Sequence, residues 1–281
     1  MKDKICLVTG ATAGIGKETA LGLAKLGAHV AIAGRDEART RATAAWLVKE
    51  SANNRVDFFV ADCSSLADVR RLGGEVRRKY PKLDVLLNNA GALFMERELT
   101  VDGFERTWAL NHLAYVLLTY ELLPSLRAAD SARIVNVASI AHRSAVLDFD
   151  NLQGEKSYGG MPNYRLSKLA NVMFTNALAR RLQDSGITVN SLHPGVVSTN
   201  FGQNNKGWIK LLIRLIRPFF ISAEEGAKTS IHLAGSKDVE GVSGQYFANC
   251  RQAPSSALSL DEAKQERLWE ISLQQAGVPV W

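Results

Sequence analysis

The stretch KICLVTGATAGIG at residues 4–16 decides the fold. Residues 4–9 are a short apolar run, which is typical of a buried strand, and the pattern that follows the glycines is helical. Glycines at Gly10, Gly14 and Gly16 let the backbone approach a phosphate, and the helix N-terminus offers free N–H groups with a partial positive charge. This order of strand, glycine-rich turn and helix therefore predicts a phosphate-binding turn.

Two better-known glycine motifs do not fit this turn. The spacing is Gly-x-x-x-Gly-x-Gly, which differs from the common dinucleotide fingerprint. A P-loop is excluded because Ala11 stands at its first glycine and Glu18 at its Ser/Thr position. The alternative to phosphate binding is a tight structural turn, which the flanking strand and helix make the weaker interpretation.

Further strands and helices alternate along the rest of the chain. Apolar runs predict strands at 28–33, 55–61, 83–87, 132–138, 187–192 and around 245–248. Helical patterns cover 36–51, 65–80, 100–123, a segment containing 163–171, and 261–276. This alternation predicts an α/β fold, a Rossmann-type doubly wound parallel sheet with helices on both faces. With no repeats and no linker, residues 1–281 are expected to form a single domain.

Composition excludes several classes of protein. The net charge of +6 is spread along the chain, so nucleic-acid binding is not indicated. Cys6, Cys63 and Cys250 have no metal-ligand spacing, so we expect no metal site and buried thiols in a reducing compartment. No apolar run approaches the roughly 18 residues of a transmembrane helix. We therefore expect a cytoplasmic protein.

The second predicted strand ends at Gly34-Arg35-Asp36. In dinucleotide-binding folds an acidic residue here holds the adenosine ribose, whereas an Arg accommodates a 2′-phosphate. Gly34 takes the acidic place and Arg35 follows, which favours NADP over NAD. Asp36 is interpreted as the cap of the next helix. The alternative is that Arg35 is only a solvated surface side chain.

Two later strand ends fall at the same edge of the sheet. Asp62 and Cys63 follow the third strand, where Asp62 either receives the adenine amino group or caps the next helix. The fourth strand ends in Asn88-Asn89-Ala90-Gly91, a small turn where a cofactor ribose would lie.

The helix containing NYRLSKLAN (163–171) carries a candidate acid/base pair. Tyr164 and Lys168 are four residues apart and therefore share one face. A cation beside a phenol lowers the phenol's pKa from about 10 toward the working pH. Such a pair also arises by chance in surface helices. Ser139, at the end of the fifth strand, places a hydroxyl on the same edge. Asn111 interrupts a predicted helix and marks either a local kink that frees a carbonyl for a water or a harmless exposed side chain.

These motifs together resemble the short-chain dehydrogenase/reductase family over nearly the whole chain. Thr9-Gly10-x-x-x-Gly14-x-Gly16, Asn88-Asn89-Ala90-Gly91, Asn111, Ser139, Tyr164-x-x-x-Lys168 and Pro194-Gly195 occur in that family's order and spacing. The stretches 151–158, 164–171 and 191–197 are similar to its retinol-dehydrogenase branch, which acts mainly with NADP(H) on lipophilic alcohols and aldehydes.

The resemblance implies a role for each matching residue. Tyr164 would be the general acid/base, Lys168 would lower its pKa and bind the nicotinamide ribose, Ser139 would hold the substrate oxygen, and Asn111 would position a water. The implied cofactor-binding residues are Gly10, Thr12, Ala13, Gly14, Ile15, Gly16, Arg35, Asp62, Cys63, Asn89, Ala90, Gly91, Tyr164, Lys168, Pro194, Gly195, Val197 and Thr199. Lys17 also matches a basic position that this family uses for NADP. His142 and His193 are interpreted as structural side chains beside strand ends.

The segment 199–222 is expected to shape the substrate pocket. Within it, residues 206–220 form an amphipathic basic helix, with Trp208 and Leu212 on the apolar face and Arg214 on another. This helix is interpreted as a lid over a lipophilic pocket. The alternatives are peripheral contact with an anionic membrane surface and a short core helix.

The sequence thus predicts an NADP(H)-dependent oxidoreductase that acts on a lipophilic alcohol or carbonyl compound: a retinoid, a long-chain aldehyde or a steroid. The competing hypothesis is a catalytically silent NADP(H)-binding protein that senses redox state or binds a partner. The oligomeric state stays open between a monomer and a homodimer through the helices that contain Asn111 and Tyr164.

Overall fold

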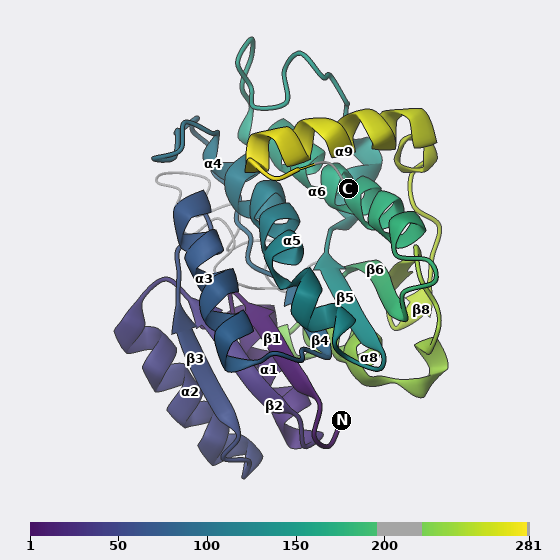
Figure 1. Cartoon of the computed structure of the whole chain (residues 1–281). Helices are drawn as coiled ribbons and strands as arrows, with labels where there is room; N and C mark the ends of the chain where they lie inside the picture. Colours follow the sequence, from purple (N-terminus) through teal and green to yellow (C-terminus); the bar gives the residue numbers. More distant parts are fainter. Residues whose placement is uncertain (196–220, 280–281) are drawn as a thin grey trace.

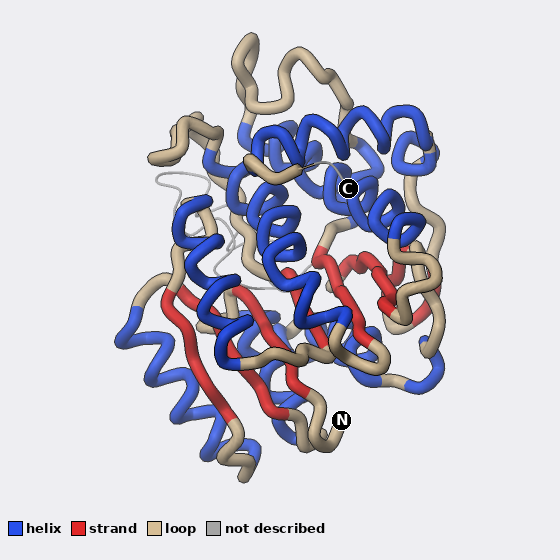
Figure 2. Tube along the Cα trace, in the orientation of Figure 1, coloured by secondary structure: helices blue, strands red, loops and turns tan. Residues whose placement is uncertain are grey.

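The computed structural model describes residues 1–195 and 221–279. Its strands are β1 (Ile5–Thr9), β2 (His29–Gly34), β3 (Val56–Val60), β4 (Val85–Asn88), β5 (Ala132–Val137), β6 (Ile187–His193), β7 (Tyr246–Ala248) and β8 (Arg251–Gln252). They form one sheet in the order β3-β2-β1-β4-β5-β6-β7-β8, in which β8 alone pairs antiparallel. Figure 2 shows this sheet in red between layers of helix. The predicted strands are confirmed, with their ends shifted by at most two residues.

Helices cover both faces of the sheet, as predicted (Figure 1). They are α1 (Gly14–Lys25), α2 (Glu37–Ser51), α3 (Leu66–Lys79), α4 (Arg106–Trp108), α5 (Ala114–Arg127), α6 (Gly160–Arg181), α8 (Ala223–Gly235) and α9 (Glu262–Ala276). Shorter turns are the π-helical η1 (Ala109–Leu113) and the 3-10 turns η2 (Ile140–Ser144), η4 (Lys237–Val239) and η5 (Ala257–Leu260).

The two faces of the sheet bury separate cores because side chains alternate along each strand. On β1, Cys6 and Val8 pack in the core that includes α1, α2 and α8. Leu7 packs in the other core, with α3, α5, α6 and α9. Strands that are apolar on both faces are typical of a doubly wound sheet.

The sequence did not predict α8. The helix residues that face the protein are mostly small, namely Gly226, Ala227, Thr229, Ser230, Leu233 and Ala234. Small and polar residues carry little apolar periodicity, which hides the helix from a pattern search. They also permit close packing on α1: a Cβ on Gly22 would lie 2.3 Å from Ile231 Cδ1.

The helix predicted at 100–123 begins later than expected. A bridge joins Leu99 to Glu105, and α4 starts only at Arg106. Glu105 caps α4 by accepting hydrogen bonds from the N–H groups of Thr107 and Trp108. The chain then passes through the π-helical turn η1 before α5 begins.

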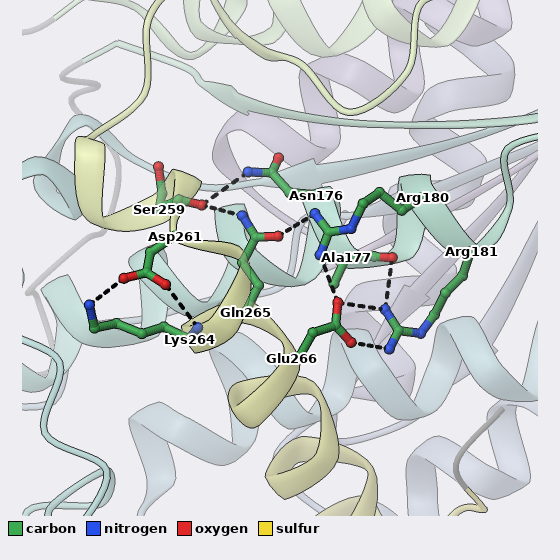
Figure 3. Close-up of polar contacts among 9 residues, drawn as sticks. All are labelled: Asn176, Ala177, Arg180, Arg181, Ser259, Asp261, Lys264, Gln265 and Glu266. Carbon is green, nitrogen blue, oxygen red and sulfur yellow. Dashed lines mark hydrogen bonds and ion pairs between the residues drawn. The ribbon is translucent and has the colours of Figure 1, made fainter.

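The C-terminal helix α9 packs across α5 and α6 (Figure 1). Trp269 of α9 is buried and stacks on Phe174 of α6, with ring centroids 5.5 Å apart. Figure 3 shows the polar contacts of this interface, where Glu266 pairs with Arg180 and Arg181. Among the described residues, no helix is both long and apolar enough to span a membrane.

Candidate active site

A cleft of about 570 Å³ lies at the carboxyl ends of the parallel strands. This is the edge at which open α/β sheets bind their ligands. Its lining includes these residues predicted from the sequence: Gly10, Thr12, Ala13, Gly14, Ile15, Gly16, Arg35, Asp62, Cys63, Asn89, Ala90, Gly91, Ser139, Tyr164, Lys168, Pro194 and Gly195. The fold thus brings motifs from the whole chain to one site.

The glycine turn forms a cradle that side chains would fill. A Cβ on Gly16 would lie 2.4 Å from Asn89 Nδ2 and 2.5 Å from the Gly10 carbonyl oxygen. Gly10 has a φ of +64°, and a Cβ there would lie 2.7 Å from Ala90 Cα. Ala13, the N-cap of α1, makes no side-chain cap hydrogen bond, unlike the caps of α2, α3 and α9. The free N–H groups at the start of α1 therefore suit a phosphate.

Asn89 ties the end of β4 to this turn. Its Nδ2 donates to the Thr9 carbonyl oxygen over 2.8 Å, and its backbone N–H donates to Thr9 Oγ1 over 3.0 Å. The Ala90 N–H donates to the same hydroxyl. Two neighbouring strand ends are thereby held together beneath the cleft.

The end of β2 excludes an acidic side chain at the position of Gly34. A Cβ there would lie 2.4 Å from Thr12 Cγ2 and 2.5 Å from Thr40 Oγ1. Arg35 lines the cleft beside it, and so does Arg39, which the sequence analysis missed. Its signal was its place in the first turn of α2, which starts directly after Arg35 and the cap Asp36.

Asp36 caps α2 as predicted, because its Oδ1 accepts from the Arg39 N–H over 2.8 Å. Asp62 does not cap α3. Ser65 does so, while Asp62 Oδ1 accepts from the N–H and hydroxyl of Ser64. Lys17 points elsewhere: its Nζ lies 3.5 Å from the centroid of the Trp46 ring, and Lys17 does not line the cleft.

Tyr164 and Lys168 lie side by side on α6, as the helical spacing predicted. A hydrogen bond joins Tyr164 to the side chain of Ser139. Ser139 Oγ also accepts from the Ala141 N–H over 3.2 Å, which leaves the serine proton to donate. Lys168 Nζ donates to the Val137 carbonyl oxygen over 2.9 Å and lies 5.8 Å from the centroid of the Tyr164 ring.

Burial dominates the titration of this pair. It raises the pKa of Tyr164 to about 12, although the hydrogen bond with Ser139 acts in the opposite direction. It lowers the pKa of Lys168 to about 7. The net pKa of Tyr164 therefore lies above its usual value, because burial disfavours the phenolate and the ammonium alike. At neutral pH the phenol carries its proton.

Asn111 lies behind the cleft rather than on its surface. It is fully buried in the π-helical turn, which confirms a local kink and excludes an exposed side chain. A Cβ on Gly91 would lie 3.1 Å from Asn111 Oδ1 and 3.4 Å from Lys168 Nζ. The side chains of Asn111 and Lys168 therefore both lie close to Gly91 in the turn after β4.

The end of the cleft beside Tyr164 is apolar. Its lining there includes Leu93, Phe94, Leu110, Ile140 and Met161, none of which the sequence analysis named. The signal for Met161 was its position three residues before Tyr164 on the same helix. Arg106 also lines the cleft and lies over the Phe94 ring, 4.3 Å from its centroid.

Comparison with known proteins agrees with this geometry. The model of the family described as short chain dehydrogenase matches residues 4–210. The chain belongs to this family. Mouse (Mus musculus) retinol dehydrogenase 12 is 40% identical over 275 residues, covering 98% of this chain and 87% of that protein. This dehydrogenase therefore lies in the retinol-dehydrogenase-like branch.

Solved structures share the fold of this dehydrogenase. A putative uncharacterized protein from Mycobacterium paratuberculosis superposes with a TM-score of 0.81 at 29% identity, covering 99% of this chain and 96% of that one. The RhlG/NADP active-site complex of Pseudomonas aeruginosa gives a TM-score of 0.71 at 30% identity, covering 88% and 94%. With the glycine cradle and the free N-terminus of α1, these likenesses support a nicotinamide cofactor. Val197, Thr199 and most of the segment 199–222, including the helix predicted at 206–220, lie outside the described residues.

Proposed function

We propose that this dehydrogenase is an NADP(H)-dependent alcohol dehydrogenase/carbonyl reductase that acts on lipophilic substrates such as retinal, long-chain aldehydes or ketosteroids. The observation that carries the proposal is the group of Tyr164, Ser139 and Lys168 at the apolar end of the cleft. Family membership already makes the chain a hydride-transfer oxidoreductase. The substrate class, the cofactor preference and the residue roles are the proposal.

Tyr164 acts as the general acid in carbonyl reduction. Its phenol is protonated at neutral pH and buried beside Ser139, so a carbonyl oxygen placed between the two receives the phenol proton. The Ser139 hydroxyl donates a second hydrogen bond to that oxygen and stabilises the charge that develops there. A bound nicotinamide supplies or accepts the hydride. Oxidation of the alcohol reverses each proton transfer.

Lys168 supports the phenol after proton transfer. With a pKa of about 7, its ammonium is a stronger acid than the phenol, so it stabilises a phenolate and can return a proton to it. Its bond to the Val137 carbonyl oxygen holds it at the carboxyl end of β5, where it would bind the nicotinamide ribose of a bound cofactor. Asn111 supports this arrangement from behind by holding the chain next to Gly91 in place.

The end of the cleft beside β2, where we place the adenosine of the cofactor, supports a preference for NADP(H). The packing around Gly34 leaves no room for the carboxylate that would hold a 2′-hydroxyl. Arg35 and Arg39 line the cleft at that point, and the Arg guanidinium is well suited to bind phosphate.

The apolar end of the cleft beside Tyr164 supports a lipophilic substrate. Phe94, Leu110 and Met161 line this part of the cleft, and Met95 and Ile140 continue the apolar surface outward, each more than a third exposed. Binding an apolar chain here removes its surface from water, worth about 25 cal/mol per Å².

Steady-state NADPH oxidation by the purified protein tests the proposal. The carbonyl substrates are all-trans-retinal, a medium-chain aldehyde and a ketosteroid, each repeated with NADH. Turnover of at least one, with a strong preference for NADPH, is the expected result. Turnover that favours NADH would remove the roles given to Arg35 and Arg39. No turnover of any of the three would contradict the lipophilic substrate class.

A further inference from the structure

His142 lies in the 3-10 turn η2 and is almost completely buried next to Ser139. Each ring nitrogen meets a backbone group: Nδ1 lies 2.7 Å from the Ser139 carbonyl oxygen, and the Ser256 N–H reaches Nε2 over 3.1 Å. A carbonyl oxygen can only accept a hydrogen bond, and a backbone N–H can only donate one. The ring is therefore neutral, with its proton on Nδ1.

The same turn fixes the direction of the Ser139 side chain. The Ser139 carbonyl oxygen accepts from the backbone N–H of His142 over 3.2 Å as well as from its ring. Ser139 Oγ accepts from the N–H of Ala141 over 3.2 Å. The orientation of η2 thus sets where the Ser139 hydroxyl points, and the His142 ring bonds η2 to Ser256.

The partner of His142 belongs to a C-terminal segment that is anchored on α6. The Ser256 carbonyl oxygen accepts from the Ser259 N–H over 3.0 Å. The Ser259 carbonyl oxygen accepts from Asn176 Nδ2 of α6 over 3.1 Å and from Gln265 Nε2 of α9 over 2.7 Å (Figure 3). Ser259 and Gln265 are almost fully buried, which favours a fixed geometry.

These hydrogen bonds connect the two elements that carry Ser139 and Tyr164 through the C-terminal segment. Helix α6 carries Tyr164, and the turn η2 follows Ser139. The C-terminal segment is bonded to both, through Asn176 on one side and His142 on the other. Arg143 adds a second bond between turn and segment, donating to the Pro254 carbonyl oxygen over 2.7 Å.

We propose that His142 is a positioning residue for Ser139: its Nδ1–H holds the Ser139 carbonyl oxygen, and the Ser256 N–H, on the segment fastened to the tyrosine helix, steadies the far side of the ring. The inference rests on the proposed function, in which Ser139 binds the substrate oxygen. It assigns no contact with substrate to His142. Its consequence is that loss of the bond from Nδ1 to the Ser139 carbonyl lowers kcat while leaving cofactor binding intact.

The surroundings of His142 favour its neutral form. Its ring packs against the titratable Tyr246, with centroids 4.8 Å apart, and Arg143 and His193 are the other charged or titratable groups that act on it among residues 1–195 and 221–279. Burial lowers the pKa of His142, and the positive charge of Arg143 acts in the same direction.

Two substitutions of His142 distinguish the effect of its Nδ1 hydrogen bond to Ser139 from that of its Nε2 hydrogen bond to Ser256. In His142→Asn the amide nitrogen takes the place of Nδ1 and keeps the donor to the Ser139 carbonyl. In His142→Gln the longer side chain keeps an acceptor for the Ser256 N–H but loses the donor to Ser139. We expect kcat for reduction of the best wild-type carbonyl substrate to fall about tenfold in His142→Gln and less than about threefold in His142→Asn. The Kd for NADPH, measured by fluorescence titration, stays within about twofold in both.

Asp261→Ala is the control for general loosening of the C-terminal segment. Asp261 caps α9 by accepting from the Lys264 N–H over 3.1 Å (Figure 3), and its side chain takes no part in the bonds of the His142 ring. We expect this variant to lose stability in urea unfolding and to keep kcat. A loss of kcat equal to that of His142→Gln, or equal losses in the Gln and Asn variants, would overturn the proposal.

The ¹⁵N NMR spectrum of histidine in the wild-type protein gives a readout that needs no turnover. The signal absent from His142→Asn assigns His142, and we expect a neutral ring protonated at Nδ1 at pH 7. An Nε2-protonated ring, or an imidazolium, would refute the inference. If the wild-type protein turns over none of the carbonyl substrates, the proposed function fails, and the NMR result alone decides the geometry of His142.

Discussion

The side chain of Asn111 pairs with both backbone groups of Ala92. Asn111 Oδ1 accepts from the Ala92 N–H over 2.8 Å, and Nδ2 donates to the Ala92 carbonyl oxygen over 2.9 Å. Nδ2 also donates to Ser167 Oγ on α6. One buried amide therefore holds the turn after β4 against the helix that carries Lys168.

Asn111→Leu is expected to destabilise the fold and lower turnover together. The substitution leaves both backbone groups of Ala92 without their partner, at a cost of about 1–3 kcal/mol each when buried. Urea unfolding measures the loss, and kcat should fall because the chain beside Lys168 is released. Asn111→Asp keeps the acceptor for the Ala92 N–H and should be less destabilised. An Asn111→Leu variant as stable as the wild type would contradict this structural role.

Tyr164→Phe is expected to lower kcat by about 10²–10⁴-fold, the usual contribution of a positioned proton donor. The ring stays in place, so the Kd for NADPH should change less than about twofold. Tyr120→Phe removes a phenol hydroxyl from α5 outside the cleft lining and is the matched control. Substantial turnover by Tyr164→Phe would show that another group donates the proton.

Arg35→Ala is expected to raise the KM for NADPH by about 10–100-fold and to leave the KM for NADH nearly unchanged. A hydrogen bond to a charged group contributes about 1.5–3 kcal/mol, and only NADPH carries the 2′-phosphate. Arg39→Ala should act in the same direction. Arg41→Ala is the control, since Arg41 pairs with Glu37 over 2.7 Å and does not line the cleft. Equal losses with both cofactors would exclude phosphate binding at Arg35.

Asp57 is expected to stabilise the protein at neutral pH and to lose that effect in acid. Burial alone raises the pKa of Asp57, but hydrogen bonds from Lys79, Tyr80 and His29 outweigh it and lower the pKa to about 2. Because the folded pKa lies below the unfolded value of about 3.9, the stabilisation is complete above pH ~4 and disappears as the pH falls toward 2.

Asp57→Asn should therefore reduce the free energy of unfolding by about 1 kcal/mol at pH 7, allowing for solvent screening. Urea unfolding between pH 7 and pH 2 measures the difference from wild type, which should shrink as the pH falls. A difference that stays constant through this range would show that the carboxylate charge plays no part.

Helix α9 leads us to expect a monomer. It packs across α5 and α6, the helices through which a homodimer was considered, and its Trp269 is only 2% exposed. A second copy could pair there only after α9 leaves and its buried apolar surface becomes exposed to water. Sedimentation velocity should give the 30.7 kDa mass of one chain. A species of twice that mass would require another interface or a displaced α9.

Much of the fold and site could be predicted because the signals are local. The alternation of short apolar runs with helical patterns sets the layers, and the i, i+4 spacing sets Tyr164 and Lys168 on one face. Glycine at 34 in place of an acid is equally visible in the sequence. Helix α8 escaped because its buried face is small and polar, and Asn111 gave only a hint of the π-helical turn.

By itself the sequence determined the parallel sheet, the edge where the motifs meet and the placement of Tyr164 and Lys168 on one helix face. Only the tertiary structure decided that Asn111 acts from behind the cleft, that Arg39 joins Arg35, and that Ser256 meets His142 across 114 positions of the chain. The physical reason is the range of each interaction. Helical and strand periodicities relate residues a few positions apart, whereas contacts between distant segments depend on how complete helices pack on the sheet.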